Sequence, residues 1–103
     1  MAEFVPVAKI DQLPPGKTMC VVVDGQRIAL YNVEGTVYAT DDTCSHAEAS
    51  LSEGCLEGDV IECPRHGARF NVRTGQALSL PAWAPVATYP VKVEDGEIKV
   101  SLG

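Results

Sequence analysis

The sequence predicts an all-β fold of about eight to ten short strands. Short runs of β-branched and aromatic residues alternate with turn residues along nearly the whole chain. Gly-containing pairs at 24–25, 34–35 and 95–96 separate such runs, which is the pattern of tight β-hairpins. No stretch shows the sustained periodicity of an amphipathic helix. With 103 residues, the chain is expected to form a single domain over residues 1–103.

The first part of the chain predicts an edge strand followed by a meander. Residues 4–8 form the first candidate strand, and Pro6 places it at a sheet edge because proline cannot donate a ladder hydrogen bond. Residues 13–17 are rich in Pro and Gly and predict a turn. The meander that follows has expected strands at 19–23, 26–31 and 36–40.

The second part predicts short strands around two irregular segments. Strands are expected at 59–62 and 68–71, with Gly67 allowing a tight turn between them and Gly75 a chain reversal after them. Residues 79–85 form a stiff apolar loop that contains two prolines. Alternating apolar and charged residues then predict closing antiparallel strands at 86–89, 91–93 and 98–100.

Composition excludes several classes of function. The net charge of −6 argues against nucleic-acid binding, which needs basic patches. The N-terminal residues lack the basic and apolar regions of a leader, and no run reaches the ~18 apolar residues of a membrane span. These features predict a cytoplasmic protein without a membrane contact. Four cysteines in such a chain favour metal ligation over a disulfide framework.

Two clusters carry the chemistry. Cys44 and His46 form a C-x-H pair, and Cys63 and His66 form a C-x-x-H pair; the chain has no other histidine. Thiolate and imidazole together form a metal-ligand set. A Cys₂His₂ zinc site is one alternative, but a zinc finger places its histidines on a helix, and no helix is indicated after Cys63. A [2Fe–2S] cluster with two thiolates on one iron and two imidazoles on the other explains why each segment supplies both ligand types.

This spacing, together with Asp42-Thr43, Gly67 and Thr74-Gly75 around it, resembles the Rieske [2Fe–2S] fingerprint. Over nearly its whole length the chain is similar to the stand-alone Rieske-type ferredoxins of bacterial ring-hydroxylating dioxygenase systems. The resemblance implies a small Rieske-type fold of antiparallel sheets, with a two-loop cluster-binding part at about residues 41–85. It also implies one cluster, held by Cys44 and Cys63 on the inner iron and by His46 and His66 on the outer iron.

The resemblance further implies a monomeric one-electron carrier and not an enzyme. Such a ferredoxin accepts an electron from a flavin-containing NAD(P)H reductase and passes it to a terminal oxygenase with its own Rieske centre. A complete oxygenase is excluded because its mononuclear iron needs two more histidines. Two alternatives stay open: a ferredoxin serving another client, such as iron–sulfur assembly, and the small Rieske-like subunit of nitrite reductase, many members of which lack the four ligands.

The surroundings of the ligands predict a low reduction potential. Respiratory Rieske proteins carry a disulfide and two hydroxyl groups beside the cluster, where this chain has Ala49 and Arg65, and Ala68 and Phe70. Hydrogen bonds to sulfur stabilise the reduced state, so their loss predicts a potential on the order of −150 mV.

The remaining candidate residues have structural interpretations. Cys20 is expected to be a buried free thiol and Cys55 an incidental loop thiol. The segment 81–83 with Trp83 is expected to pack over the cluster or to contribute to docking. The acidic residues around the first loop are either a solvated face or a rim that orients the reductase; they are Glu48, Glu53 and Glu57.

Overall fold

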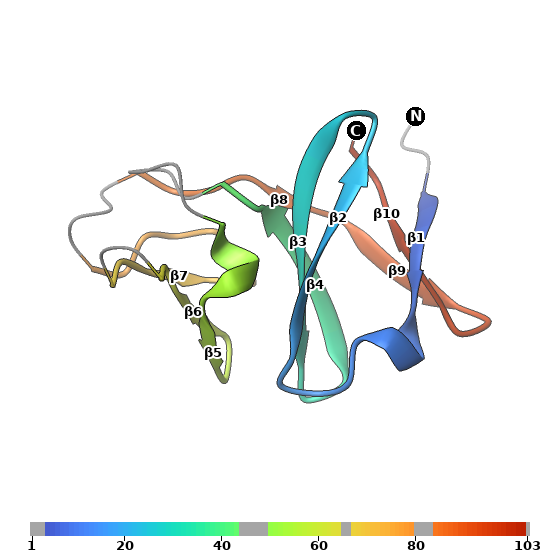
Figure 1. Ribbon diagram of the computed structural model, residues 1–103, viewed down its shortest axis with the longest axis horizontal. Coiled ribbons are helices and arrows are strands. Elements are labelled where there is room, and N and C mark those ends of the chain that lie inside the picture. The colour runs from blue at the N-terminus through green and yellow to red at the C-terminus, as the bar shows by residue number, and fades with distance from the viewer. Residues whose placement is uncertain (1–3, 44–49, 65–66, 80–83, 103) are drawn as a thin grey trace.

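The computed structural model describes residues 4–43, 50–64, 67–79 and 84–102, and these form an all-β fold (Figure 1). The prediction of fold class is therefore confirmed. Within the described residues lie ten strands and two 3₁₀ turns. The strands are β1 (Val5–Lys9), β2 (Thr18–Val23), β3 (Gln26–Val33), β4 (Thr36–Asp41), β5 (Cys55–Glu57), β6 (Val60–Glu62), β7 (Arg69–Asn71), β8 (Thr88–Tyr89), β9 (Val91–Glu94) and β10 (Glu97–Val100), and the turns are η1 (Ile10–Gln12) and η2 (Leu51–Glu53).

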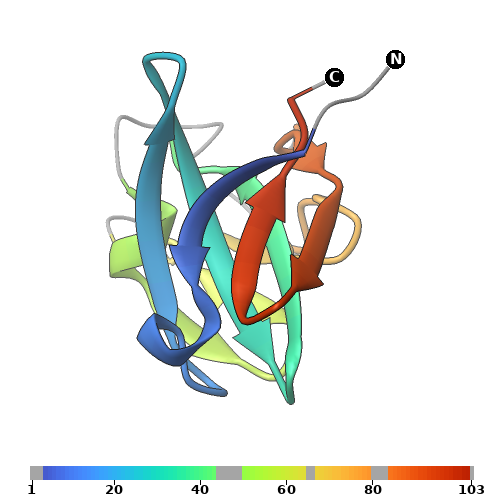
Figure 2. The same ribbon diagram turned by 90° about the vertical axis from the view of Figure 1, so that its right-hand side faces the viewer.

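The strands form three antiparallel sheets. A four-stranded sheet has the order β2-β3-β4-β8 and holds the expected meander. A three-stranded sheet, β1-β10-β9, packs on one side of it, as Figure 2 shows with the orange and dark-blue strands in front. The small sheet β5-β6-β7 lies at the other end of the molecule (Figure 1). The four-stranded sheet is thus the middle element of the fold.

The three predicted Gly-containing pairs form tight turns. Asp24 and Gly25 both have positive φ, at 50° and 78°, and join β2 to β3. The pairs at 34–35 and 95–96 repeat this conformation between β3 and β4 and between β9 and β10. A turn of two consecutive residues with positive φ matches the right-handed twist of paired strands, which explains why these pairs join the strands of hairpins.

β3 is buried on both faces and divides the interior into two cores. Side chains of successive residues on a strand point to opposite faces. Ile28 and Leu30 therefore pack with Ile98 and Val100 of the three-stranded sheet. The alternate residues of β3 face the small sheet and the loops beside it. This second core consists of Ala29, Tyr31, Val33, Leu51, Ile61, Cys63, Ala68, Phe70, Val72 and Val86.

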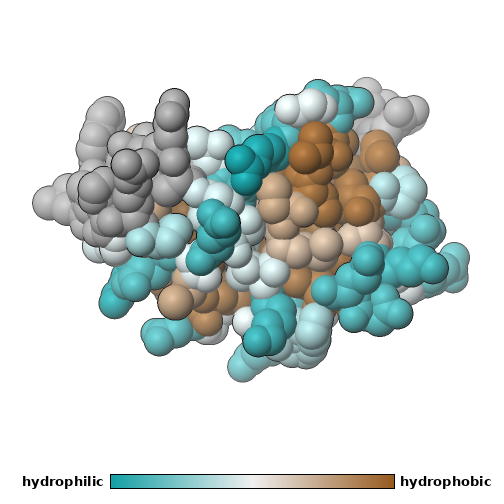
Figure 3. All heavy atoms as spheres, in the orientation of Figure 1, coloured by the Kyte–Doolittle hydropathy of each residue, from teal (hydrophilic) through white to brown (hydrophobic). Residues whose placement is uncertain are grey.

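β1 lies at a sheet edge, as Pro6 predicts. It pairs only with β10 within its sheet, and the register shifts between Pro6 and Ala8. Val5 of β1 and Val22 of β2 are exposed. Figure 3 shows an apolar area over these two strands. It lies at the opposite end of the molecule from the small sheet (Figure 1).

Two parts of the fold differ from the sequence-based expectation. Residues 55–57 were expected to be a loop but form β5, which pairs with β6. Gly54 allows this pairing, because a Cβ there would lie 2.0 Å from the carbonyl oxygen of Glu62. Of the expected strand 86–89, only Thr88–Tyr89 pairs with β4, because Val86 instead donates its N–H to the carbonyl of Gly75.

Tyr89 ties β8 to the meander through its hydroxyl. The phenol donates to the Asp41 carboxylate and accepts from the Gln26 side chain. Burial, and then the hydrogen bond to Asp41, raise the pKa of Tyr89 to about 12. A pKa raised above its unfolded value of about 10 stabilises the fold below that pH, and this stabilisation is lost as the pH rises through the folded value.

We expect Tyr89→Phe to lower the unfolding free energy by about 1 kcal/mol, the usual net value of one hydrogen bond. Thermal unfolding monitored by circular dichroism at neutral pH measures the loss. The difference between the two proteins should shrink between pH 10 and pH 12, where the wild-type phenol ionises. A difference that stays constant over this range would show that the hydroxyl contributes nothing through these hydrogen bonds.

Candidate metal centre

Cys63 is fixed by the hairpin of β6 and β7. These strands pair Glu62 with Arg69, and the ladder continues because the N–H of Cys63 donates to the carbonyl of Ala68 at 2.7 Å. The carbonyl of Cys63 accepts from the N–H of Gly67 at 3.2 Å, and Gly67 has a φ of 73°. Cys63 is 1% exposed and belongs to the second core. The structure thus places Cys63 in the hairpin that the sequence predicts, directly after β6 and with its side chain buried.

The first ligand segment leaves the fold at Asp42 and returns at Ser50. Asp42 accepts the N–H of Leu51 on its carbonyl at 2.6 Å, and Thr43 forms an isolated bridge with Ser50. The Asp42 carboxylate accepts from the Ser50 hydroxyl at 2.6 Å and from the Ser52 N–H at 3.0 Å. The residues on either side of 44–49 are therefore joined directly to one another.

The Asp42 carboxylate is buried and paired with Arg27 of β3. Asp42 is 1% exposed, and one Arg27 guanidinium nitrogen lies 3.1 Å from its Oδ2. Burial would raise the pKa of Asp42, but the hydrogen bonds from Ser50 and Ser52 and the charge of Arg27 together lower it below its usual value. The carboxylate is therefore ionised at neutral pH, and its charge is compensated by local donors.

A third segment is anchored beside β7. The N–H of Arg69 donates to the Ser79 hydroxyl at 3.1 Å, and the N–H of Leu78 donates to the Arg69 carbonyl at 2.7 Å. Further along, the N–H of Val86 donates to the Gly75 carbonyl at 2.9 Å. Ser79 and Val86 are thus both held against the β7 segment. Pro81, Ala82 and Trp83 fall outside the described residues.

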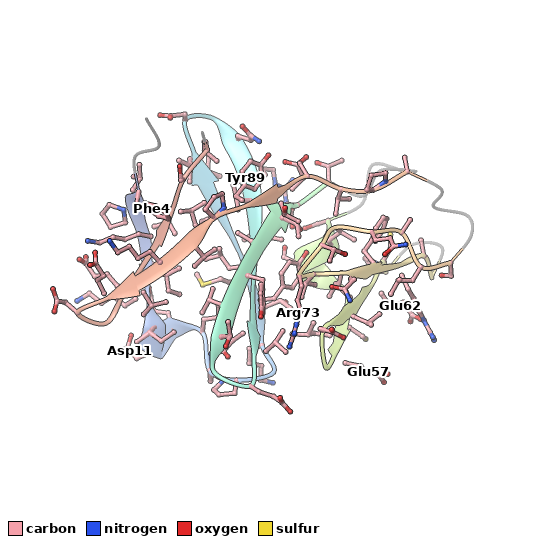
Figure 4. The ribbon with its side chains drawn as sticks, turned by 180° about the vertical axis from the view of Figure 1, so that it is seen from behind. Phe4, Asp11, Glu57, Glu62, Arg73 and Tyr89 are labelled. Carbon is pink, nitrogen blue, oxygen red and sulfur yellow. The ribbon has the colours of Figure 1, made fainter. Side chains whose placement is uncertain are left out.

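The small sheet is joined to the middle sheet by Arg73. Its guanidinium lies 5.6 Å from the ring centroid of Tyr38 on β4, and 3.6 Å separates its Nε from the Asp59 carboxylate. Figure 4 shows Arg73 between the green β4 strand and the small sheet, with Glu57 and Glu62 further out on that sheet. Together with the second core, this contact fixes the orientation of the Cys63 hairpin relative to β4.

Ala68 and Phe70 both lie in the second core and are fully buried. Neither side chain can donate a hydrogen bond. These two positions therefore offer no hydrogen bond to a sulfur atom, which is the basis of the predicted low potential. Ala49 and Arg65, which stand where respiratory Rieske proteins have their disulfide, lie outside the described residues.

Of the four predicted ligands, the structure describes Cys63. Cys44, His46 and His66 fall outside the described residues, as does Glu48. Glu53 and Glu57 are exposed. This exposure is compatible both with a solvated face and with a rim that orients the reductase.

The two remaining cysteines differ from their expected environments. Cys20 lies on β2 and is half-buried, not buried, because it sits on a solvent-facing side of this edge strand next to Arg27. Cys55 is exposed and belongs to β5, not to a loop. The Arg27–Asp42 pair was not predicted. The only sequence signal for it is an acidic residue two positions before Cys44.

The donors fit a Rieske cluster. Two thiols and two imidazoles match its ligand set, and Cys63 is buried in the apolar second core. Within the described ranges, no three His, Cys, Asp or Glu side chains form a separate metal-binding group. In the same part of the chain, no helix is long and apolar enough to cross a membrane.

Comparison with known proteins agrees with this geometry. The Rieske [2Fe–2S] domain family matches residues 3–90. The ferredoxin component of the naphthalene 1,2-dioxygenase/salicylate 5-hydroxylase systems of Ralstonia sp is 46% identical over 99 residues, which cover 96% of this chain and 95% of that protein. The 3-phenylpropionate/cinnamic acid dioxygenase ferredoxin subunit of Shigella flexneri serotype 5b (strain 8401) is 57% identical over 76 residues, covering 73% and 72% of the two chains.

A solved structure gives the same result. A chain in the complex of reduced oxygenase and oxidized ferredoxin in carbazole 1,9a-dioxygenase is 44% identical, with a TM-score of 0.90, and the match covers 95% of this chain and 92% of that one. The fold, the cofactor and the class of protein agree across these comparisons. The chain belongs to the Rieske [2Fe–2S] domain family, and within it to the ferredoxins that carry electrons and do not themselves catalyse oxygenation.

Proposed function

We propose that Cys44 and Cys63 hold one iron of the cluster and that His46 and His66 hold the other. When bound, the cluster supplies a centre that gains and loses one electron at a time. The ferredoxin accepts an electron from a flavin-containing NAD(P)H reductase and delivers it to a terminal oxygenase that has its own Rieske centre. The protein works at a low potential, near the negative end of the Rieske range, on the order of −150 mV.

The observation that carries this proposal is the donor set on this frame. The only two histidines of the chain stand in two matched pairs with cysteines, and the described member, Cys63, is held at a hairpin tip facing the core. Similarity to dioxygenase ferredoxins supports a terminal oxygenase as the electron acceptor, because the alignment with the Ralstonia protein covers 96% of this chain. The neighbouring ferredoxin was solved in complex with its oxygenase, which supports direct transfer to that partner.

The cofactor assignment is tested by chemical analysis together with electron paramagnetic resonance (EPR) of the dithionite-reduced protein. We expect about two iron and two sulfide ions per chain and the EPR signal of a reduced Rieske cluster. A colourless protein that carries one zinc ion would contradict the assignment of all four ligands.

The assignment of partners is tested by reconstitution. With NADH, a dioxygenase ferredoxin reductase and a Rieske terminal oxygenase, adding this protein should start aromatic dihydroxylation, and omitting it should stop the reaction. Mass spectrometry of the diol measures the product. A protein that is reduced by the reductase but is not reoxidised by any such oxygenase would serve another client, such as iron–sulfur assembly.

His66→Cys tests one imidazole ligand directly. A third thiolate should shift the absorption and EPR spectra towards those of plant-type clusters and lower the potential, because plant-type ferredoxins lie near about −400 mV. Voltammetry and EPR of the purified variant measure both changes. Replacement of the exposed Gln76 with Cys adds a thiol without removing a ligand and is the control. An unchanged spectrum in His66→Cys would remove His66 from the ligand set.

A further inference from the structure

Both ends of the first ligand segment meet at one side chain. Asp42 precedes Cys44 by two residues, and its carboxylate accepts hydrogen bonds from Ser50 and Ser52, which follow the segment. Its carbonyl also accepts the N–H of Leu51. Asp42 therefore joins the residues before and after 44–49. We call these two flanking stretches, residues 42–43 and 50–52, the neck.

The neck is attached to the middle sheet on two sides. Arg27 of β3 pairs with the Asp42 carboxylate, and the Arg27 carbonyl accepts the Asp42 N–H at 3.2 Å. Thr18 of β2 donates its hydroxyl to the Ser52 carbonyl at 2.6 Å. Because β2 and β3 are paired along their lengths, these contacts fix the neck to a rigid part of the fold.

A buried carboxylate at position 42 would destabilise the fold if its charge had no partners. Asp42 is 1% exposed, and burying a carboxylate is unfavourable unless donors surround it. Here one hydroxyl and one backbone N–H donate to it, and one guanidinium forms an ion pair with it. Only an ionised carboxylate suits all three partners, because an asparagine amide would place its NH₂ group either against the Ser52 N–H or against Arg27 and the Ser50 hydroxyl.

We propose that Asp42 is the positioning residue of the first ligand pair: its carboxylate joins residue 42 to Ser50 and Ser52 and so fixes the two ends of the stretch of sequence that carries Cys44 and His46. The inference rests on the proposed assignment of these two residues as ligands. Holding the ligands in place before binding lowers the ordering entropy that cluster retention must overcome.

Asp42→Asn and Ser50→Ala test this inference in the cluster-loaded protein. We expect Asp42→Asn to speed the loss of the cluster to a chelator about tenfold, which corresponds to about 1.4 kcal/mol, and to broaden the EPR signal. Ser50→Ala keeps the charge and removes one donor, so it should show a smaller change of the same kind. It also keeps the test valid if Asp42→Asn does not fold.

Two control variants separate positioning from other effects. Glu94→Gln makes the same change of charge in an exposed ion pair on β9 and should leave both readouts at wild-type values. Ile98→Val lowers stability in the other core, and its EPR signal should stay that of the wild type. If Asp42→Asn and Ser50→Ala lower the melting temperature like Ile98→Val but keep the wild-type EPR signal and rate of loss, the inference is wrong. A wild-type protein without iron and sulfide would instead refute the ligand assignment itself.

Discussion

Replacing Gly75 with alanine is expected to cost about 3 kcal/mol or more, a large part of the stability of a domain of this size. Gly75 is buried and has a φ of 78°, where a side chain costs about 1–2 kcal/mol. An added Cβ would also lie 2.1 Å from the Val86 carbonyl oxygen and 3.0 Å from the Thr88 side chain. The backbone cannot move away without losing the hydrogen bonds of Gly75 with Asn71 and Val86. Chemical denaturation measures the loss.

Gly96→Ala is the matched control for this prediction. Gly96 has nearly the same φ, 76°, but nothing lies within 4 Å of an added Cβ. It should therefore cost only the conformational term, about 1–2 kcal/mol. The excess in Gly75→Ala measures how tightly residues 86–88 are held against the β7 segment. Equal losses in the two variants would show that the chain at Val86 moves aside freely.

The parts of the fold that the sequence predicts are those fixed by local chemistry. Asp24-Gly25 adopts the two positive φ angles of a tight hairpin turn, so the meander around it could be expected from a few residues. Pro6 marked the edge strand because its missing N–H excludes a central position. Gly67 and Cys63 belong to a turn between two short strands, which indicated the hairpin that holds the thiol.

The parts that were missed depend on contacts between distant residues. β5 exists because Gly54 approaches the backbone of Glu62, and nothing in residues 55–57 alone favours a strand. The Arg27–Asp42 pair joins β3 to the neck, and an arginine fifteen residues away carries no signal of that contact. Cys20 was expected to be buried from its Val-rich neighbours, but β2 is an edge strand, and one of its faces meets solvent.

Ala68→Ser combined with Phe70→Tyr is expected to raise the reduction potential by an amount on the order of 100 mV, a part of the ~450 mV range of Rieske centres. Both residues lie in the core that contains Cys63, and both are fully buried. A hydroxyl placed there needs a hydrogen-bond partner, and cluster or cysteine sulfur can accept one. Such bonds stabilise the more negative reduced state. Protein-film voltammetry of the wild type and of each variant measures the shift.

Ala39→Ser separates this effect from the mere addition of a buried hydroxyl. Ala39 is 1% exposed but packs in the other core, so its serine variant should lose stability without a change in potential. If the double variant loses stability in the same way and its potential stays at the wild-type value, the new hydroxyls do not reach sulfur. A wild-type potential above about +100 mV would contradict the prediction of a low potential, because the lack of donors at Ala68 and Phe70 should place it near the negative end of the Rieske range. A shift confined to the double variant and its two single variants would instead show that what Ala68 and Phe70 lack sets the low potential of this ferredoxin.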